Sequence, residues 1–218
     1  MIEKKYVEDI LSDMINIEGI HSQKQVEEYR EQFLEPLDVL NEDGSVAGTA
    51  PRGICHRIGL RHGTVSVIIV RRDGRMLLQH RGGGIDRKLK RLDVAVSGHL
   101  KAGEKEPKLS ACREMSEELG INPSEERMKM ISQYNRDAPL NIAKPYERNR
   151  ERRYLFQYSL TDDEGQALDS LFQRRESTNE VTAVSWYTGE EVLTAIDTGR
   201  ASDGLLTSFV HYLMMVRS

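Results

Sequence analysis

Cysteine is scarce and long apolar runs are missing from this sequence of 218 residues. The two cysteines, Cys55 and Cys112, lie far apart and form no CxxC pair, which argues against a disulfide framework and against a structural zinc cluster. An apolar run such as residues 67–70 falls far short of the roughly 18 residues that a transmembrane helix needs. The first residues also lack the basic-then-apolar order of a signal peptide. We therefore expect a cytoplasmic protein that does not associate with membranes.

An excess of positive charge is missing as well. Lys and Arg number 31 against 35 Asp and Glu, for a formal net charge of −4, which is too near balance for a protein that wraps a polyanion. We expect no stable nucleic-acid partner. The length allows one large domain, or one domain plus an extension. We predict an N-terminal helical extension over residues 1–35 and a second domain over residues 36–218.

The elements that periodicity predicts alternate between helices and strands. Apolar residues three and four apart predict two amphipathic helices within residues 1–34, broken near Gly19. The Asp-Gly pair at 43–44 and the Arg-Asp-Gly sequence at 72–74 predict hairpin turns. Further strands are expected near 92–97, 153–160 and 181–187, and helices at 108–119, 190–196 and 204–216. This alternation predicts an α/β fold with a mixed sheet between helical layers.

The predicted helix at 108–119 carries three glutamates on one face. At about 100° per residue, Glu114, Glu117 and Glu118 project at about 0°, 300° and 40°. Like charges at this spacing repel each other, and a divalent cation between them would remove the repulsion. Mg²⁺ prefers oxygen ligands and commonly joins protein carboxylates to substrate phosphates. An acidic helix face exposed to solvent is the alternative interpretation of the three glutamates alone.

The loop before this helix favours the metal interpretation. Gly98 ends a predicted strand, and Gly103 allows the tight backbone path by which a loop folds over the start of a helix. The backbone of such a loop can offer a carbonyl oxygen to the same cation. Leu109, Met115 and Leu119 are expected to give the helix an apolar face. The carboxylates are then free to point into a cleft.

At this point the sequence resembles the Nudix hydrolase family, whose signature spans a glycine, a glutamate and an Arg-Glu-apolar-x-Glu-Glu-x-Gly-apolar segment. The matching positions are Gly98, Glu104, Arg113, Glu114, Met115, Glu117, Glu118, Gly120 and Ile121. The sequence departs from the signature in one place: eight residues rather than seven separate Glu104 from Arg113. One extra residue inside the helix would rotate all that follows by about 100°. We therefore place it within 105–107, before the helix begins.

The resemblance implies a Nudix α/β/α sandwich and a hydrolase that cleaves a diphosphate linkage with the help of Mg²⁺ or Mn²⁺. The substrate class it implies is a small-molecule nucleoside diphosphate derivative or a related compound. The Arg113 side chain would orient a carboxylate, and Glu104 would brace the loop and the helix. The implied metal ligands are the carbonyl of Gly98 and the carboxylates of Glu114, Glu117 and Glu118.

The general base and the phosphate contacts stay open. Nudix enzymes take the base either from the helix or from a later loop, so Glu114 and Glu180 are both candidates. Arg81, at the end of a predicted strand, is a candidate donor to a substrate phosphate, with a surface strand-end charge as the alternative. Two prolines within residues 134–146 break both periodicities, which predicts either a loop that covers substrate or a plain connector.

The region before the helix resembles one branch of the superfamily, the type I isopentenyl diphosphate isomerases and their hydrolase-like relatives. In the isomerases, histidines at sites like His56, His62 and His99 hold a second metal, and a cysteine before the Gly-His pair transfers protons at carbon. Here Ser97 stands at that position. A hydroxyl is a much weaker acid than a thiol, whose pKa is about 8.5, so the serine disfavours isomerase activity.

Two functions of other classes stay open beside the hydrolase: the isomerase-like enzyme, and a non-catalytic nucleotide-binding module. The module is disfavoured because a binding domain has no need for the whole acidic triad. The added helices are compatible with a homodimer, although no residue pattern demonstrates one.

Overall fold

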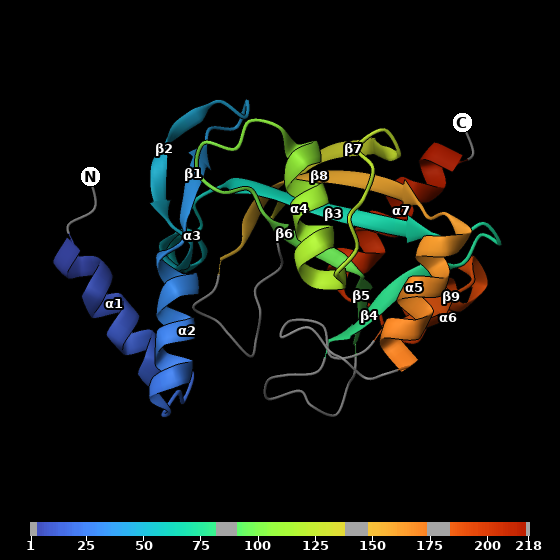
Figure 1. Cartoon of the computed structure of the whole chain (residues 1–218). Coiled ribbons are helices and arrows are strands. Elements are labelled where there is room, and N and C mark those ends of the chain that lie inside the picture. The colour runs from blue at the N-terminus through green and yellow to red at the C-terminus, as the bar shows by residue number, and fades with distance from the viewer. Residues whose placement is uncertain (1–3, 82–90, 138–147, 174–183, 217–218) are drawn as a thin grey trace. The chain divides into compact units, whose positions relative to one another are not determined.

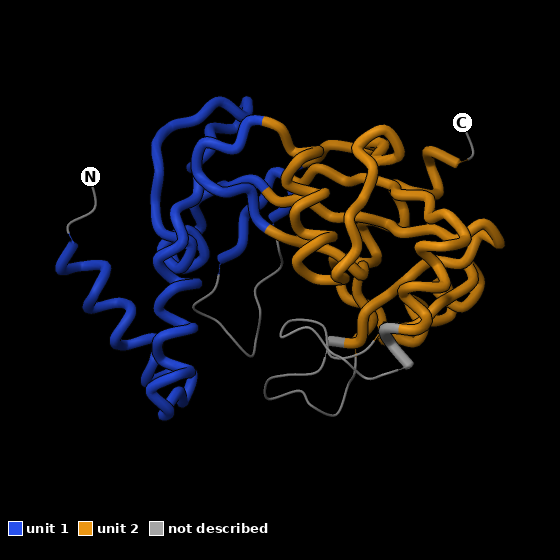
Figure 2. The backbone as a smooth tube through the Cα atoms, in the orientation of Figure 1, with its two compact units in different colours: residues 1–63, 99–105, 135–152 blue, residues 64–98, 106–134, 153–218 orange. Residues whose placement is uncertain are grey.

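The computed structural model describes residues 4–81, 91–137, 148–173 and 184–216 of the chain. Glu180, the side chain of Arg81 and most of the predicted covering loop lie outside the described residues. The described chain divides into two compact units (Figure 2). Unit 1 comprises Met1–Gly63, His99–Lys105 and Asn135–Arg152, and unit 2 comprises Thr64–Gly98, Glu106–Tyr134 and Arg153–Ser218. The predicted domain boundary at residue 35 stays a prediction.

Unit 1 opens with the two helices that the sequence predicts, α1 (Lys4–Ile17) and α2 (Gln23–Leu34). The Ser22 side chain caps α2 by accepting a hydrogen bond from the amide of Gln25 at 3.3 Å. A cluster of buried apolar side chains joins both helices to α3 (Arg52–Ile58): Val7, Leu11, Met14, Phe33 and Ile54. Amphipathic helices of this length are stabilised mainly by such packing rather than by helix propensity.

A hairpin and a short helix also belong to unit 1. The strands β1 (Pro36–Leu40) and β2 (Val46–Pro51) pair antiparallel. Strand β1 also pairs antiparallel with β3 (His62–Val70), with Val39 opposite His62. The helix α3 was not predicted, because it has seven residues and no side-chain cap. It ends at Gly59, whose φ of 74° is the left-handed conformation that glycine adopts without strain.

Unit 2 is built on strands that pair with β3 and β4 (Met76–Arg81) (Figure 1). The second predicted hairpin is present, with Val70 opposite Met76. Strand β4 lies between β5 (Arg91–Val94) and β9 (Val184–Tyr187), both antiparallel to it. Strands β6 (Val96–His99) and β8 (Arg150–Ser159) pair with β3, and β7 (Met128–Asp137) pairs with β8. The predicted fold class, α/β with a mixed sheet, is confirmed.

Helices cover the strands of unit 2. In Figure 1, α4 (Pro107–Leu119) passes in front of β3, and α7 (Asp203–Val216) lies behind it. One face of β3 contributes Ile68 and Val70 to an apolar cluster that also contains Phe209 of α7 and Val192 of α6 (Gly189–Asp197). The remaining helix is α5 (Asp162–Gln173). Among the described residues, none of the helices combines the length and the apolar character that crossing a membrane requires.

Several expectations about local structure were wrong. The strand expected at 92–97 is two strands, β5 and β6, separated at Ala95. Strand β7 occupies residues 128–137, whereas the sequence predicts a loop from residue 134. The strand is hard to predict because its polar side chains alternate on a half-exposed surface. Helix α5 begins with three acidic residues and was missed. Leu109 was placed on the apolar face of α4 but is 49% exposed; the apolar residues that α4 buries are Ala111, Met115 and Leu119.

Candidate active site and metal-binding residues

Helix α4 sets the register of the acidic residues. It begins at Pro107, which favours a first helical position because it lacks the amide hydrogen that would go unused there. It ends at Gly120 with a φ of 66°, where the glycine amide donates to the carbonyl of Ser116. Residues 105 and 106 precede the helix, so the extra residue relative to the signature can be accommodated before α4 without rotating it.

The three glutamates of α4 differ in exposure. Glu114 is 8% exposed and Glu118 is 6% exposed, whereas the Glu117 side chain is 51% exposed. Burying a carboxylate is costly unless charge or hydrogen bonds compensate it. The solvent-exposed acidic face is therefore excluded for Glu114 and Glu118, and it holds only for Glu117.

Strand β6 packs directly against both buried carboxylates. A Cβ atom added to Gly98 would lie 1.9 Å from Cδ of Glu114 and 2.1 Å from its Oε1. The space that a side chain would fill at residue 98 is therefore occupied by the Glu114 carboxylate. The preceding amide, that of Ser97, donates a hydrogen bond to Oε1 of Glu118 at 3.3 Å. Two successive residues of β6 thus each contact one of the two buried acids.

Arg113 supplies the positive charge beside these acids. Its Nη1 donates to Oε1 of Glu114 at 2.8 Å and to Oε2 of Glu117 at 3.0 Å. Charge-assisted hydrogen bonds of this length hold a carboxylate in one orientation. The guanidinium therefore ties the buried Glu114 to the exposed Glu117, one turn further along the helix.

The residues around Gly98 fit a hard divalent cation. The three carboxylates of α4 offer oxygen donors, two of them pair with the guanidinium of Arg113, and the missing side chain at Gly98 brings a backbone strand into contact with Glu114. Mg²⁺ and Mn²⁺ take carboxylate and carbonyl oxygens as ligands. The donor set at β6 and α4 is thus the right one for such an ion.

Glu104 closes the loop that precedes α4. Its carboxylate accepts a hydrogen bond from the amide of Lys101 at 2.9 Å. The neighbouring Gly103 has a φ of 82°, and its amide donates to Oδ2 of Asp38 at 2.9 Å. This glycine is needed here, since a side chain at that φ would be strained. The loop is held within unit 1 by these contacts.

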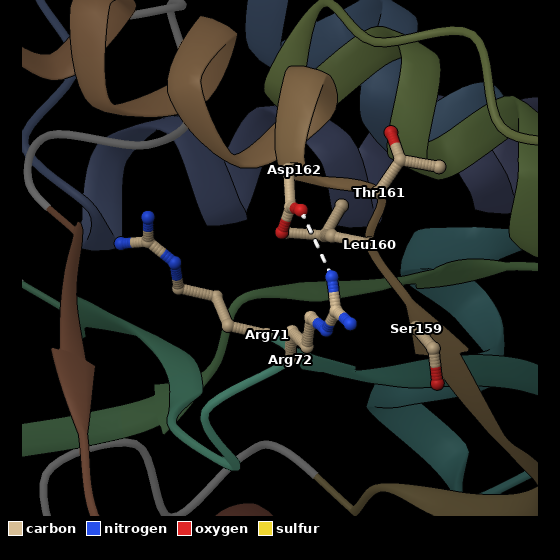
Figure 3. A pocket seen from close by; sticks show the side chains of 6 residues that line it. All are labelled: Arg71, Arg72, Ser159, Leu160, Thr161 and Asp162. Carbon is tan, nitrogen blue, oxygen red and sulfur yellow. Dashed lines mark hydrogen bonds and ion pairs between the residues drawn. The ribbon is translucent and has the colours of Figure 1, made fainter.

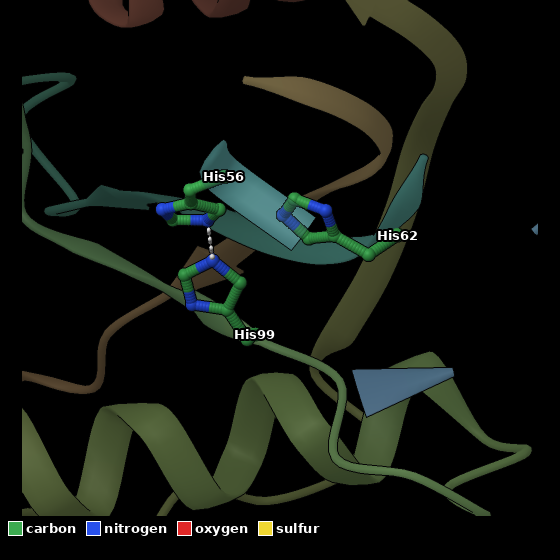
Figure 4. Close-up of side chains that lie close together, drawn as sticks. All are labelled: His56, His62 and His99. Carbon is green, nitrogen blue, oxygen red and sulfur yellow. Dashed lines mark hydrogen bonds between the residues drawn. The ribbon is translucent and has the colours of Figure 1, made fainter. Parts of the chain in front are cut away.

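Three histidines of unit 1 converge (Figure 4). His56 lies on α3, His62 begins β3 and His99 ends β6, and one ring nitrogen of each lies within 4.8 Å of the others. Nε2 of His56 and Nε2 of His99 are 3.2 Å apart. The resemblance to the isomerases names all three histidines, whereas sequence spacing alone does not bring them together, because they come from three separate elements.

Of the three histidines, His62 has the best-defined surroundings for a candidate ligand. Its Nδ1 donates to the carbonyl of Leu60 at 2.9 Å, which leaves the lone pair on Nε2. That Nε2 is buried and has no hydrogen-bond partner among the described residues. Burial also lowers the pKa of His62 below 6.5, so the ring stays neutral at physiological pH. A neutral imidazole with its other nitrogen bound to a backbone carbonyl is the usual form of a metal-ligating histidine.

One surface hollow of unit 2, of about 490 Å³, lies at the turn between β3 and β4 and the start of α5 (Figure 3). None of the predicted site residues lines it; its lining residues are Arg71, Arg72, Ser159, Leu160, Thr161 and Asp162. Arg72 pairs with Asp162 across it at 3.4 Å, and Arg71 pairs with Asp169 and covers the ring of Trp186. Both arginines thus already pair with protein carboxylates.

Comparison with known protein sequences identifies the family to which the chain belongs. A sequence model of the NUDIX domain family matches residues 60–207, which is more than half of the chain. The chain therefore belongs to the Nudix family. The isomerase-like branch within that family stays a prediction.

Particular relatives are more distant. The chain is 35% identical over 112 residues to Nudix hydrolase 3 from Arabidopsis thaliana, a match that covers 50% of this chain and 14% of that protein. It is 33% identical over 89 residues to an uncharacterized Nudix hydrolase from Clostridium acetobutylicum, covering 39% of this chain and 42% of that one. The matches thus span less than half of either relative. The crystal structure of DR0079 from Deinococcus radiodurans shares the fold, with a TM-score of 0.51, 21% identity, and coverage of 82% of this chain and 97% of that one.

Proposed function

We propose that this protein is a divalent-metal-dependent Nudix hydrolase that cleaves the diphosphate linkage of a nucleoside diphosphate derivative or a related small molecule. One observation carries the proposal: two buried carboxylates, Glu114 and Glu118, lie against a strand that has no side chain at Gly98. A bound divalent cation would offset part of the free-energy cost of burying these two carboxylates. Membership of the Nudix family supports the same conclusion.

The residues divide the work as follows. The Gly98 carbonyl and the carboxylates of Glu114, Glu117 and Glu118 would hold Mg²⁺ or Mn²⁺. When bound, such an ion neutralises charge on the phosphoryl oxygens and favours the attack of water. Arg113 positions Glu114 and Glu117 through its two hydrogen bonds.

We also propose candidates for the group that accepts a proton from the attacking water and for the group that donates a hydrogen bond to a substrate phosphate. Glu114 is one candidate for the base, and its contact with Arg113 holds the carboxylate in a fixed orientation. Glu180 is the other, and Arg81 is proposed to donate to a substrate phosphate. A base must come within hydrogen-bond reach of the attacking water, so kinetic comparison of the two glutamates is the way to choose between them.

The three histidines are proposed to hold a second metal ion of a different kind. Their donors are neutral nitrogens, which suit zinc, cobalt, nickel or copper better than magnesium. The orphaned, buried Nε2 of His62 supports the site. This favours the isomerase-like branch of the family as the origin of the chain, but Ser97 does not favour its reaction: the Ser97 hydroxyl lies 3.2 Å from another hydroxyl, that of Ser66, which is not a base.

Three further proposals concern the location, the binding partners and the oligomeric state of the protein. We propose a cytoplasmic location, no stable binding to nucleic acid or membrane, and a homodimer as the state to test. The near-balanced charge supports the second of these. Size-exclusion chromatography with light scattering measures the third directly.

The experiment is phosphate release from a panel of nucleoside diphosphates, dinucleotides, nucleotide sugars and prenyl diphosphates, with Mg²⁺ and with EDTA. The proposal expects cleavage of at least one class, dependent on the ion. Replacement of Glu117 and Glu118 by Gln should abolish turnover while the circular dichroism spectrum stays unchanged. The exposed Glu126→Gln is the matched control. Retained turnover in the double variant contradicts the assignment, and binding of a nucleotide without cleavage supports the non-catalytic module instead.

A further inference from the structure

We propose that Ser66 is a positioning residue for the acidic metal site: its hydroxyl, through that of Ser97, fixes strand β6 against helix α4. The inference rests on the proposed function, because it concerns the site formed by Gly98, Glu114 and Glu118. It adds a residue from outside the signature, 32 positions before Gly98 in the chain.

The first observation is a hydroxyl pair inside unit 2. Oγ of Ser66, on β3, and Oγ of Ser97, on β6, are 3.2 Å apart. Ser66 is fully buried, at 0% exposure, and stands between Val65 and Val67 in a strand whose residues are all buried. A hydroxyl in such a place costs free energy unless it is hydrogen-bonded. The hydrogen bond to Ser97 therefore compensates the burial of the Ser66 hydroxyl, and it joins β6 to β3.

The second observation is the alternation of β6. Successive residues of a strand point to opposite faces. Ser97 directs its hydroxyl to Ser66, while the next residue, Gly98, presents its bare Cα to the carboxylate of Glu114. The amide of Ser97 also donates to Glu118. The hydroxyl pair thus holds Ser97. The amide of Ser97 donates to the buried Glu118, and its neighbour Gly98 contacts the buried Glu114.

These contacts leave little freedom for the carbonyl of Gly98. Strand β6 has four residues, so its position depends on a small number of bonds. Loss of the hydroxyl pair would let residues 97 and 98 move relative to α4, and both carboxylates would lose part of their fixed partner. Groups that orient metal ligands in this way typically contribute about 10- to 100-fold to metal affinity.

The test is Mn²⁺ binding to the full-length protein without substrate, followed by the electron paramagnetic resonance signal of free Mn²⁺. We assign to the acidic site the component of Mn²⁺ binding that is lost in the double variant Glu114→Gln/Glu118→Gln. We compare Ser66→Ala, Ser97→Ala and the double variant Ser66→Ala/Ser97→Ala. Each should weaken this component by about tenfold, and the double variant should be no weaker than the single ones, because all three remove the same hydrogen bond.

The double variant separates positioning from simple stability. Ser97→Ala leaves the buried hydroxyl of Ser66 without its partner, and Ser66→Ala leaves the half-buried hydroxyl of Ser97 without its partner. The double variant leaves neither hydroxyl, and removal of both partners is close to neutral for stability. We therefore expect the double variant to regain the wild-type melting temperature but not the wild-type Mn²⁺ affinity. Ser208→Ala is the matched control: Ser208 is equally buried, lies on α7, and its Oγ has no hydrogen-bond partner among the described residues. It should bind Mn²⁺ as the wild type does.

The outcomes distinguish the two proposals. Wild-type Mn²⁺ affinity in Ser66→Ala/Ser97→Ala overturns the positioning role and leaves the proposed function standing. A wild-type protein with no component that Glu114→Gln/Glu118→Gln removes overturns the metal site, and with it this inference. Weakened binding in the double variant with unchanged binding in Ser208→Ala supports the positioning role.

Discussion

The acidic residues of unit 2 and the histidines of unit 1 are two candidate metal sites with opposite chemistry. The first consists of charged oxygens on one helix, with Glu114 and Glu118 buried against Gly98. The second consists of neutral nitrogens from three elements, with His62 fully buried. The first set carries negative charge, part of which Arg113 offsets, and a bound cation would offset more of it. The second needs no cation for charge balance, and its evidence is a lone pair on His62 that has no partner among the described residues.

The difference shows how selectivity between ions can be built into one chain. Carboxylates and carbonyls suit Mg²⁺ and Mn²⁺, and imidazoles suit zinc and its neighbours. Each site can therefore be probed with its own ion.

Glu118→Gln should have the largest effect. It keeps the size of the side chain but removes a buried charge from the acidic set, and a loss of about 4 kcal/mol of transition-state stabilisation corresponds to roughly a 1000-fold loss of kcat/KM. Cobalt binding to the histidines should be unchanged. Steady-state kinetics with Mg²⁺ and a cobalt titration measure the two. A variant that loses both properties would break the separation between the sites.

His62→Gln should give the reverse pattern. It removes the ligand whose Nδ1 is held by Leu60, and we expect Co²⁺ affinity to fall by about 100-fold, since a lost ligand costs at least as much as a lost outer partner. The visible absorption of bound Co²⁺ reports this directly. Mn²⁺ binding at the acidic site should stay at the wild-type level. Unchanged Co²⁺ absorption in the variant would show that the histidines do not hold the ion.

Gly98→Ala tests the close approach of β6 to Glu114. The added methyl would overlap the carboxylate, and overpacking of this kind costs about 1–3 kcal/mol of unfolding free energy. Mn²⁺ affinity should fall with it, by about tenfold. Urea unfolding and the Mn²⁺ titration measure both. Gly189→Ala is the control, because a Cβ there meets nothing within 4 Å. Equal behaviour of the two variants would contradict the packing described for β6.

The pH dependence of stability should show the smallest effect. Burial lowers the pKa of His62 below its ordinary value of 6.5, so the unfolded chain binds more protons than the folded one as the pH falls through and below 6.5. The free energy of unfolding should therefore decrease as the pH falls from about 6.5, and increase to a plateau above it. In EDTA, His62→Gln should flatten this part of the profile in urea unfolding. A profile identical to that of the wild type would place His62 in a less buried environment.

Local sequence predicts which acidic residues of α4 share a face better than it predicts the convergence of the three histidines, for a physical reason. The residues of α4 are contiguous, so helix periodicity and the terminal Gly120 fix which side chains share a face. Burial was not predictable in the same way: Glu117 is exposed and Leu109 is exposed, because the surroundings of α4 decide which side of it is covered.

The histidine cluster and the serine pair depend on long-range pairing. His56 lies on a seven-residue helix without a side-chain cap, for which the sequence has no signal. Ser66 and Ser97 are 31 residues apart and meet only because β6 pairs with β3. Likewise, the alternating polar residues of 128–137 form strand β7 only through pairing with β8. Contacts of this kind follow from the assembled sheet, not from local propensity.

The most direct test of the acidic metal site is X-ray data collected at the manganese absorption edge from crystals of the protein soaked in MnCl₂. The account predicts an anomalous peak in coordination contact with the carboxylates of Glu114 and Glu118 and with the carbonyl oxygen of Gly98. Fully soaked crystals with no peak there, and with both carboxylates bound only to protein or water, would contradict it.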